Sequence, residues 1–327
     1  MIAIQNASRM LLIVVLIGCT GAARSQVAAT GSVQAYPERP VRIVTAEAGG
    51  GNDFQARQIA QGLAAVLGQP VIVDNRAGII AVETALKASP NGHTLLYYGG
   101  AFWIVPLLGK TSYDPEKDFA PIVAAASSSN ILAVNPAVAA KSVKDLITLA
   151  KAKPGEINYA SGPTGNANHL AAELFNYMAG VNIVRIAYKG TAQAINDVIA
   201  GHVQIMFNNT AGTVPHIKSG RLRALAVTSL ERSPLVPELP TVAASGLPGF
   251  QAGSLFGIWA PAGTPTPIIT RLNQEIVKIL SRPEIKERFL NTGMEAMGST
   301  PRELAVIIKA DMARMDKLIK AAGIKAE

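Results

Sequence analysis

Short runs of β-branched and other apolar residues alternate with longer helical patterns along most of the chain, and this alternation limits the possible folds more than any other feature. Runs of this kind are typical of buried strands, whereas the segments between them repeat apolar residues at helical spacing. We predict strands at residues 41–45, 71–73, 94–98, 131–134, 157–160, 183–187, 203–207 and 222–228. Strands that alternate with helices predict an α/β fold with mostly parallel strands.

Helix signals are clearest near the two ends of this region. Apolar residues at 59, 63, 66 and 67 form one stripe that packs against a sheet. Near the C-terminus, residues 300–303 combine an N-cap, a proline at the first helical position and a capping box. A long helix should follow and end at Gly323. Its predicted apolar face consists of Leu304, Ile307, Ile308, Met315, Leu318 and Ile319.

Length and composition predict a globular protein of about two domains. The chain has 327 residues, and a domain has roughly 150 residues on average. Hydrophobic residues make up 49% of the chain and charged residues 16%, which is too apolar for a disordered protein. The formal net charge is +8. No long basic run is present, so the positive charge is spread over the surface, where it can attract small anions.

The N-terminus predicts export. Arg9 precedes an apolar run at residues 10–17 that is too short to span a membrane and has the layout of a secretory signal. The segment ending in Cys19, the only cysteine, resembles the lipobox of bacterial lipoproteins, in which the cysteine is lipidated. Alternatively, cleavage near residues 22–23 or 28–29 releases a soluble exported protein. Both interpretations exclude nucleic acid as a partner and leave no cysteine for disulfides or thiol catalysis.

Two glycine-rich junctions between a strand and a helix carry the functional argument. The first spans residues 46–53, where three consecutive glycines let the backbone approach a ligand, and Asn52 or Asp53 can cap a helix that starts near Phe54. The second spans residues 161–169 and adds hydroxyl groups. Helix N-termini of this kind attract anions. A single glycine-rich turn is more often only a tight connection, so the functional interpretation rests on the pair.

Neither junction matches a nucleotide-binding motif. Phe54 stands where the third glycine of the dinucleotide motif would come, and no Gly-Lys-Ser or Gly-Lys-Thr follows either loop. His93, His202 and His216 are scattered, without the spacing of a metal cluster. We therefore expect no cofactor and no metal.

A series of segments from Tyr36 to Glu327 resembles the Bug family of periplasmic solute receptors, the binding proteins of tripartite tricarboxylate transporters. The matching segments are YPERPVRIV, GGGND, GQPVIVDNRAG, YDPEKDFAPI, KAKPGEINYASGPTGNANHLAAELF, YKGTAQAINDVIAGHVQIMFNN, RLRALAVTS, RSPLVPELPTVAASGLPGF, GIWAPAGTP and KAAGIK. The resemblance implies a two-domain periplasmic binding protein, or Venus flytrap, with the ligand in the cleft between the domains. It also implies a monomer that is not an enzyme, captures a small carboxylate and delivers it to membrane transporter subunits.

The resemblance also implies the domain boundaries. Residues 1–35 form the signal peptide and linker, residues 36–133 with 257–327 form a discontinuous first domain, and residues 134–256 form the second. Ala48 stands where the family usually has Pro, Asn52 where it has Thr, and Asn208 where Asp is common. The loop at residues 75–81 is shorter than the family's NRPGAGGNIGA loop, which leaves the part of the ligand beyond its carboxylate undetermined.

Matching positions assign ligand contacts to the two junctions, to a YKG turn and to an asparagine pair. The assigned residues are Gly49, Gly50, Gly51, Asn52 and Asp53; Ser161, Thr164, Gly165, Asn166 and His169; Tyr188, Lys189 and Gly190; and Asn208 and Asn209.

Several of these residues have an ordinary structural alternative. We expect His169 to hydrogen-bond the loop rather than act as a base or metal ligand, and Asp53 to cap the helix, because a carboxylate would repel an anionic ligand. Lys189 either meets the carboxylate or lies on a surface turn, and the asparagine pair either donates amides or ends a strand. Phe102 and Trp103 either stack on an aromatic ligand or fill the core.

The pattern indicates capture by neutral dipoles, in which N–H groups and hydroxyls from both domains bind one carboxylate and favour the closed state. Dicarboxylates, tricarboxylates, acidic amino acids and aromatic acids all meet this requirement. A sensor subunit for a membrane kinase would use the same capture step. A secreted hydrolase using Ser161 and His169 is disfavoured, because the chain lacks a G-x-S-x-G elbow and places both residues around one helix start.

Overall fold

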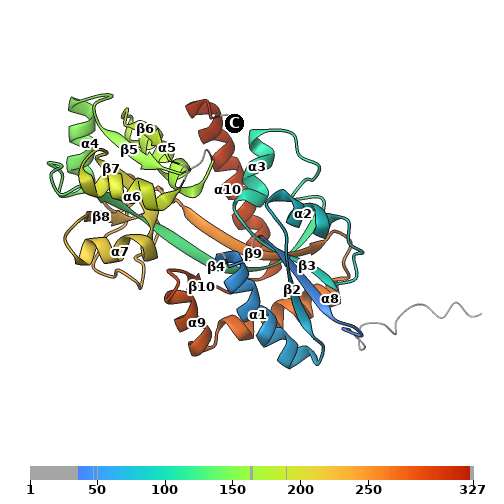
Figure 1. Ribbon diagram of the computed structural model, residues 1–327. Coiled ribbons are helices and arrows are strands. Elements are labelled where there is room, and N and C mark those ends of the chain that lie inside the picture. The colour runs from blue at the N-terminus through green and yellow to red at the C-terminus, as the bar shows by residue number, and fades with distance from the viewer. Residues whose placement is uncertain (1–35, 47, 50, 163–164, 189, 325–327) are drawn as a thin grey trace, which may run out of the picture. The chain divides into compact units, whose positions relative to one another are not determined.

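The computed structural model describes residues 36–46, 48–49, 51–162, 165–188 and 190–324. The chain divides after Tyr36, and all the elements below belong to the unit Pro37–Glu327. Within the described residues this unit holds a sheet of ten strands flanked by helices, so the predicted α/β class is confirmed (Figure 1). No helix in these ranges combines the length and the apolar character needed to cross a membrane.

The strands lie in the order β2-β1-β3-β9-β4-β7-β5-β6, and β8 and β10 also pair with β4. They are β1 (Val41–Thr45), β2 (Val71–Asn75), β3 (Thr94–Gly99), β4 (Phe119–Val134), β5 (Asn158–Ser161), β6 (Val184–Ala187), β7 (Ile205–Asn209), β8 (Arg223–Val227), β9 (Gly253–Pro261) and β10 (Glu295–Ala296). Parallel pairs occur in β2-β1-β3, here called the β1 end, and in β6-β5-β7, the β5 end. Every pairing of β4 or β9 is antiparallel, so the sheet is mixed rather than mostly parallel.

Helices connect the strands as the alternation predicts. They are α1 (Gly51–Leu67), α2 (Ile79–Leu86), α3 (Ala101–Leu108), α4 (Val143–Ala152), α5 (Ala167–Ala179), α6 (Thr191–Ala200), α7 (Thr210–Lys218), α8 (Thr266–Leu280), α9 (Pro283–Leu290) and α10 (Pro301–Ala322). Of these, α1, α3, α5 and α7 follow β1, β3, β5 and β7 along the chain. α1 begins at Gly51, earlier than the predicted Phe54, and the predicted stripe residue Val66 is exposed.

The two strands that join the ends of the sheet are the ones that the sequence pattern predicts least well. β4 has 16 residues, but the predicted strand covers only 131–134, because Pro121 lies within the apolar first half of β4 and three serines at 127–129 separate that half from the second. β9 escapes prediction because Gly257 divides its apolar residues into two short groups. Both strands are held by pairing with their neighbours rather than by their own propensity.

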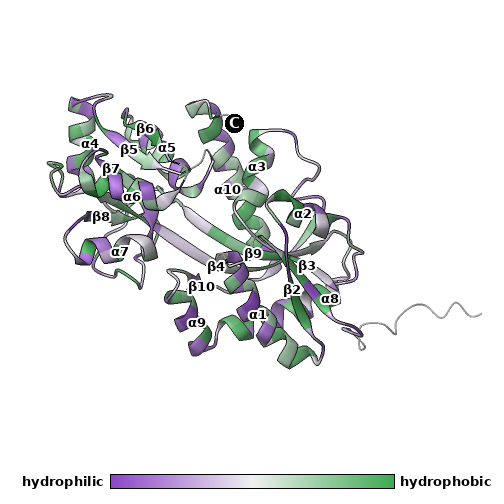
Figure 2. Cartoon of the chain, viewed as in Figure 1, coloured by the Kyte–Doolittle hydropathy of each residue, from purple (hydrophilic) through white to green (hydrophobic). Residues whose placement is uncertain are grey.

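β4 and β9 leave no room for a side chain at Gly253. Their pairing runs from Phe119 opposite Pro261 to Ser129 opposite Gly253. A Cβ atom on Gly253 would lie 2.5 Å from the carbonyl oxygen of Ser128, so a larger residue does not fit there. Figure 2 shows this part of the pairing as pale and the part nearer β3 as apolar green.

Phe102 and Trp103 belong to an aromatic core cluster. The ring of Phe102 lies 4.9 Å from that of Trp259 and 5.0 Å from that of Phe119. Trp103 is 5.9 Å from Trp259 between ring centroids. Phe102 and Trp103 are 0% and 1% exposed. They fill the core, as one of the two alternatives predicts.

α10 confirms the predicted helix ends. The Thr300 side chain accepts from the backbone N–H of Glu303 at 3.2 Å, and the Glu303 carboxylate accepts from the N–H of Thr300 at 2.8 Å. Gly323 closes the helix in the left-handed conformation with φ 63°. The predicted apolar face is buried except at Ile307, which is 37% exposed, so the prediction is wrong for that residue.

Replacing Thr300 with Ala should lower the free energy of unfolding by about 1 kcal/mol, because the first turn of α10 loses its side-chain acceptor. Thr300→Ser keeps the hydroxyl and should lose much less. Urea unfolding followed by circular dichroism measures both variants. An equal loss in the two would show that the cap hydrogen bond contributes nothing.

Candidate functional site

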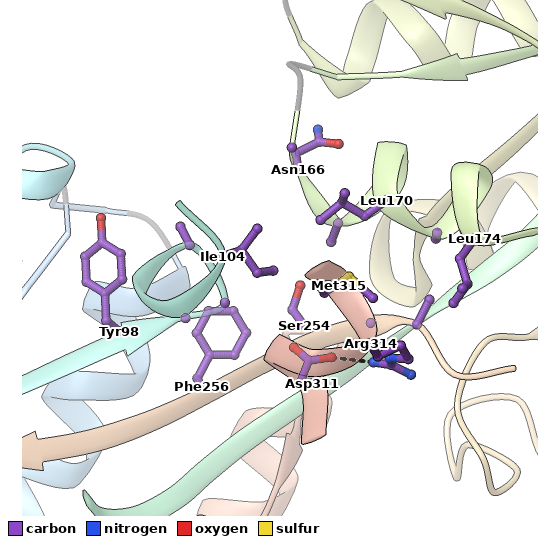
Figure 3. A pocket seen from close by; sticks show the side chains of 18 of the residues that line it. Tyr98, Ile104, Asn166, Leu170, Leu174, Ser254, Phe256, Asp311, Arg314 and Met315 are labelled. Atoms are coloured by element: carbon purple, nitrogen blue, oxygen red, sulfur yellow. Dashed lines mark hydrogen bonds and ion pairs between the residues drawn. The ribbon is translucent and has the colours of Figure 1, made fainter. Parts of the chain in front are cut away.

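Two adjoining cavities, together called the cleft here, lie among the starts of several helices. The first cavity has a volume of about 310 Å³ and the second about 540 Å³. They share Ala46, Asn52, Ser254 and Phe256 as parts of their walls. Figure 3 shows the first cavity, into which side chains from α3, α5, β9 and α10 project.

Four helices present their N-termini to the cleft. The residues that line it at these helix starts are Gly51 and Asn52 of α1, Gly100 and Ala101 at α3, Asn166 and Ala167 at α5, and Asn209 at α7. The first N–H groups of a helix have no acceptor within the helix, and the helix dipole makes this end partly positive. The two predicted junctions therefore meet at one cleft, and the starts of α3 and α7 join them.

In the first junction, Asp53 holds the loop together. Its carboxylate accepts from the N–H of Gly49 at 2.9 Å and from Asn75 Nδ2 at 3.0 Å, and it pairs with Arg57 Nε at 2.8 Å. Neither Gly49 nor Asp53 lines the cleft. Asp53 therefore lies within the first turn of α1 and binds the loop before the helix instead of capping it. Ala46, Gly51 and Asn52 are the described residues of this junction that line the cleft.

The environment of Asp53 favours the ionised carboxylate. Burial by itself would raise its pKa, but the hydrogen bonds from Arg57, Gly49 and Asn75 and the charge of Arg57 together hold the pKa below the ordinary value of 3.8. The carboxylate thus stays charged while its oxygens point to the loop.

In the second junction, Asn166 caps α5 and His169 binds the loop. The Asn166 side chain accepts from the N–H of His169 at 2.9 Å, and His169 Nδ1 accepts from the N–H of Gly165 at 3.0 Å. His169 is 4% exposed and does not line the cleft, whereas Gly165 and Asn166 do. The predicted loop-binding role of His169 is confirmed.

Ser161 lies under the second junction, in contact with a cation. Its Oγ accepts from Arg185 Nε at 2.9 Å, and Arg185 Nη2 donates to the carbonyl of Gly162, also at 2.9 Å. Ser161 is 1% exposed and lines neither cavity. Arg185 therefore places a positive charge directly behind this loop.

The remaining predicted contacts divide between the cleft and the surrounding structure. Tyr188 donates to Asp197 at 2.7 Å, and burial, this hydrogen bond and the charge of Asp197 raise its pKa to about 12. Gly190 precedes α6. Neither lines the cleft. Gly50, Thr164, Lys189 and Cys19 lie outside the described residues.

Of the predicted asparagine pair, Asn208 has a structural role and Asn209 faces the cleft. Asn208 is fully buried between two partners: it accepts from Asn168 Nδ2 at 3.2 Å and donates to Thr213 at 3.1 Å. Asn209 caps α7 by accepting from the N–H of Gly212 at 2.7 Å, and it also lines the second cavity. Asn208 therefore supports the site through Asn168, which lines the second cavity.

Part of the cleft wall carries no signal in the sequence patterns. Gly99, the last residue of β3, and Gly100 form a third glycine-containing junction, which the predicted strand at 94–98 could have indicated. Ser128 and Asn130 of β4 escape prediction because they belong to the polar part of that strand. Tyr98, which lines the first cavity, donates to the carbonyl of Gly78 at 2.9 Å. Residues 75–81, the shortened loop, do not line the cleft themselves. The loop is connected to the cleft through this hydrogen bond to Tyr98.

The C-terminal helix adds a paired charge to the first cavity. Arg314 Nη2 donates to Asp311 Oδ1 at 2.5 Å (Figure 3). Arg314 Nη1 donates to the carbonyl of Gln251, also at 2.5 Å. Trp103 Nε1 donates to Asp311 Oδ2 at 2.8 Å. The carboxylate and the guanidinium neutralise each other at the cavity wall. Among the described residues, no group of three His, Cys, Asp or Glu side chains is placed to hold a metal ion.

Comparison with known proteins identifies the family. The profile of the family described as "Tripartite tricarboxylate transporter family receptor" matches residues 55–324. The chain belongs to this receptor family. BugT of Bordetella pertussis (strain Tohama I) is 33% identical over 328 residues, covering 98% of this receptor and 99% of BugT. A protein encoded in the tcbD-tcbE intergenic region of Pseudomonas sp. (strain P51) is 36% identical over 293 residues, covering 88% and 87% of the two chains.

Solved structures resemble the receptor along most of its length. An R. palustris protein solved with adipate is 34% identical, with a TM-score of 0.72 and coverage of 89% of this chain and 99% of that one. MatC of Rhodopseudomonas palustris with bound malate is 28% identical, with a TM-score of 0.69 and coverage of 87% and 100%. The periplasmic binding protein BugD is 33% identical, with a TM-score of 0.69 and coverage of 89% and 100%. The predicted family and the periplasmic binding protein fold are confirmed.

The lowered pKa of Asp53 predicts a pH-dependent stability. A folded-state pKa below the unfolded value adds stability above the unfolded pKa, and this stability is lost as the pH falls through the folded pKa. Asp53→Asn should therefore lower the free energy of unfolding by about 2 kcal/mol near neutral pH. The difference from the wild type should shrink below the ordinary value of 3.8.

Denaturant unfolding across a pH series measures this difference. Asp316→Asn is the matched control, because Asp316 forms an exposed pair with Lys320 and should change stability little. An Asp53→Asn deficit that stays constant through acid pH would contradict the role of the charged carboxylate.

Proposed function

We propose that the protein is an exported solute-binding receptor that captures a small carboxylate in the cleft and delivers it to a tripartite tricarboxylate-type transporter. The observation that carries this proposal is the convergence of the N-termini of α1, α3, α5 and α7 on two adjoining cavities. Each N-terminus carries roughly half a positive charge. Four of them favour an anion without requiring an unpaired cationic side chain in the wall, since Arg314 is paired with Asp311.

The composition of the cleft wall supports an anionic ligand. No acidic side chain among the described residues lines the second cavity, and the only one lining the first, Asp311, is paired with Arg314. Arg185 adds a positive charge behind the second junction. A carboxylate in the cleft would therefore meet N–H donors and amides rather than a repelling charge.

Neutral donors also suit a receptor that must release its ligand. A bidentate Arg fork would hold a carboxylate more tightly. Binding in the micromolar range corresponds to roughly 8 kcal/mol, which several hydrogen bonds and the desolvation of the cleft can supply. Delivery to a membrane partner requires this moderate affinity.

The capture step follows from the placement of the cleft. We assign residues 36–133 with 257–327 to one domain and residues 134–256 to the other, joined by β4 and β9. The cleft wall draws Asn52 and Gly100 from the first domain and Asn166 and Asn209 from the second. A ligand that touches both would favour the closed arrangement over the open one.

The relatives and the N-terminal sequence support the ligand class and the location. Adipate and malate are the ligands named for two of the similar structures, and both are carboxylates. The apolar run at residues 10–17 would direct export, with either lipidation at Cys19 or cleavage after it. We assign the protein to the periplasm as a monomer.

Catalysis by Ser161 and His169 is not part of this function. Ser161 Oγ is engaged by Arg185 Nε, and His169 Nδ1 by the N–H of Gly165. A nucleophile and its base must be within hydrogen-bond reach of each other. These separate partners favour a binding protein over a hydrolase.

A thermal-shift screen tests the proposal. The protein from Tyr36 to Glu327 is heated with citrate, malate, succinate, adipate, glutamate and benzoate, and with the corresponding amides, at fixed pH and salt. Ligands that bind the native state raise the melting temperature by mass action. A subset of the acids should stabilise the protein while their amides do not. No shift with any acid would contradict the carboxylate assignment.

Asn52→Asp supplies a matched test of the cleft. Asn52 lines both cavities, so an isosteric carboxylate there should weaken binding of the stabilising acid at least about tenfold by repulsion. Asn182→Asp, an exposed position that lines neither cavity, should leave binding unchanged. Equal affinity of the two variants for the acid would contradict ligand binding in the cleft.

A further inference from the structure

Two buried side-chain amides in the wall of the second cavity have N–H donors without a hydrogen-bond acceptor. Gln55 is 0% exposed and Asn130 is 2% exposed, and both line this cavity. Gln55 Nε2 and Asn130 Nδ2 have no hydrogen-bond partner among the described residues. A buried polar group without a partner costs stability, so such groups call for an explanation.

The orientation of Gln55 is fixed by a buried tyrosine. The hydroxyl of Tyr97 donates to Gln55 Oε1, and Tyr97 is fully buried. Burial raises the pKa of Tyr97 well above its ordinary value, so the hydroxyl keeps its proton and needs an acceptor. Gln55 therefore turns its Oε1 to Tyr97 and leaves its Nε2 as the free group.

The free Nε2 lies next to the first helix start of the cleft. A Cβ atom on Gly51 would lie 3.8 Å from it. Because Gly51 has no side chain, the donor stays uncovered on the side of the glycine-rich junction. A ligand bound at the start of α1 would come within reach of Gln55.

Asn130 projects from the polar part of β4. Its backbone N–H donates to Thr228 Oγ1 at 2.8 Å, and its carbonyl accepts from the N–H of Thr228 at 2.9 Å. The backbone is thus satisfied, and the side-chain amide remains for the cavity. In contrast, the Nδ2 of Asn168 in the same wall is engaged by Asn208, at 3.2 Å.

We propose that Gln55 and Asn130 form a second polar subsite. This subsite binds an oxygen acceptor in the part of the ligand beyond its carboxylate, so the proposal rests on the proposed function. The described wall of the second cavity has no charged side chain to hold a cation or a lone anion. The two buried side-chain groups of this wall that lack a hydrogen-bond partner, Gln55 Nε2 and Asn130 Nδ2, are both N–H donors. The ligand class is therefore an acid with a second oxygen, such as a hydroxy, oxo or dicarboxylic acid, and not a plain alkanoic acid.

A first experiment needs no ligand. Asn130→Ala should cost less free energy of unfolding than Asn135→Ala, its matched control just after β4. The amide of Asn135 donates to the carbonyls of Val198 and Ile199 and accepts from Ala137, and Asn135 lines neither cavity. An equal or greater cost for Asn130→Ala would show that its amide has a structural partner and would overturn the inference.

A second experiment compares acids of equal length by titration calorimetry. The probes are hexanoate, 6-hydroxyhexanoate and adipate, and butanoate, 4-hydroxybutanoate and succinate. At the chain length that binds, an acid with a terminal oxygen should bind the wild type about tenfold more tightly than the alkanoate. Equal affinity for the alkanoate would overturn the subsite.

Two variants connect this preference to the residues. Asn130→Ala, and Gln55→Leu combined with Tyr97→Phe, which removes both partners of one hydrogen bond, should each reduce the preference to about threefold or less. Asn135→Ala should keep it. An equal loss of affinity for all the acids would overturn the subsite, because it would show no effect specific to the second oxygen. It would not contradict the proposed carboxylate capture. If none of the six acids binds while an acid of the thermal-shift panel does, the subsite is overturned and the proposed function stands. If no acid of either panel binds, the proposed function fails as well.

Discussion

The antiparallel pairing of β4 with β9 is the constraint on which the rest of the structure depends. It joins two groups of parallel strands that would otherwise be separate sheets, and β4 alone also pairs with β7, β8 and β10. The absence of a Cβ atom at Gly253 lets the two backbones approach. With the strands held this way, the helices that follow β1, β3, β5 and β7 all begin at one cleft. Ligands of α/β sheets commonly bind outside the carboxyl ends of strands.

The loops at the cleft are stabilised by groups that do not face it. Asp53 holds the first junction and His169 the second, each by accepting a backbone N–H of its own loop. Such contacts fix the helix starts before a ligand arrives, so the dipoles need little reorganisation on binding. The residues most suggestive of acid–base chemistry in the sequence therefore act as supports for the loop backbone.

Local sequence signals predict the elements and the two junctions, but not the whole cleft. The apolar runs place β1 and β5, and the capping box with Gly323 places both ends of α10, because these signals depend on near neighbours along the chain. The polar middle of β4 and the glycine-interrupted β9 owe their conformation to cross-strand pairing, which no local pattern reveals. Gln55 and Asn130 show the same limit: each is an ordinary amide in the sequence, and only the three-dimensional arrangement shows that its donor is buried without a partner.

The aromatic cluster behind the first cavity also determines how the molecule can be observed. Trp103 and Trp259 are the only two tryptophans of the chain, and their rings lie 5.9 Å apart in that cluster. The indole N–H of Trp103 is bonded to Asp311, which stands in the cavity wall. The tryptophan fluorescence of the protein therefore arises from one place, and one of the two indoles is connected by a single hydrogen bond to the surface that a ligand would touch.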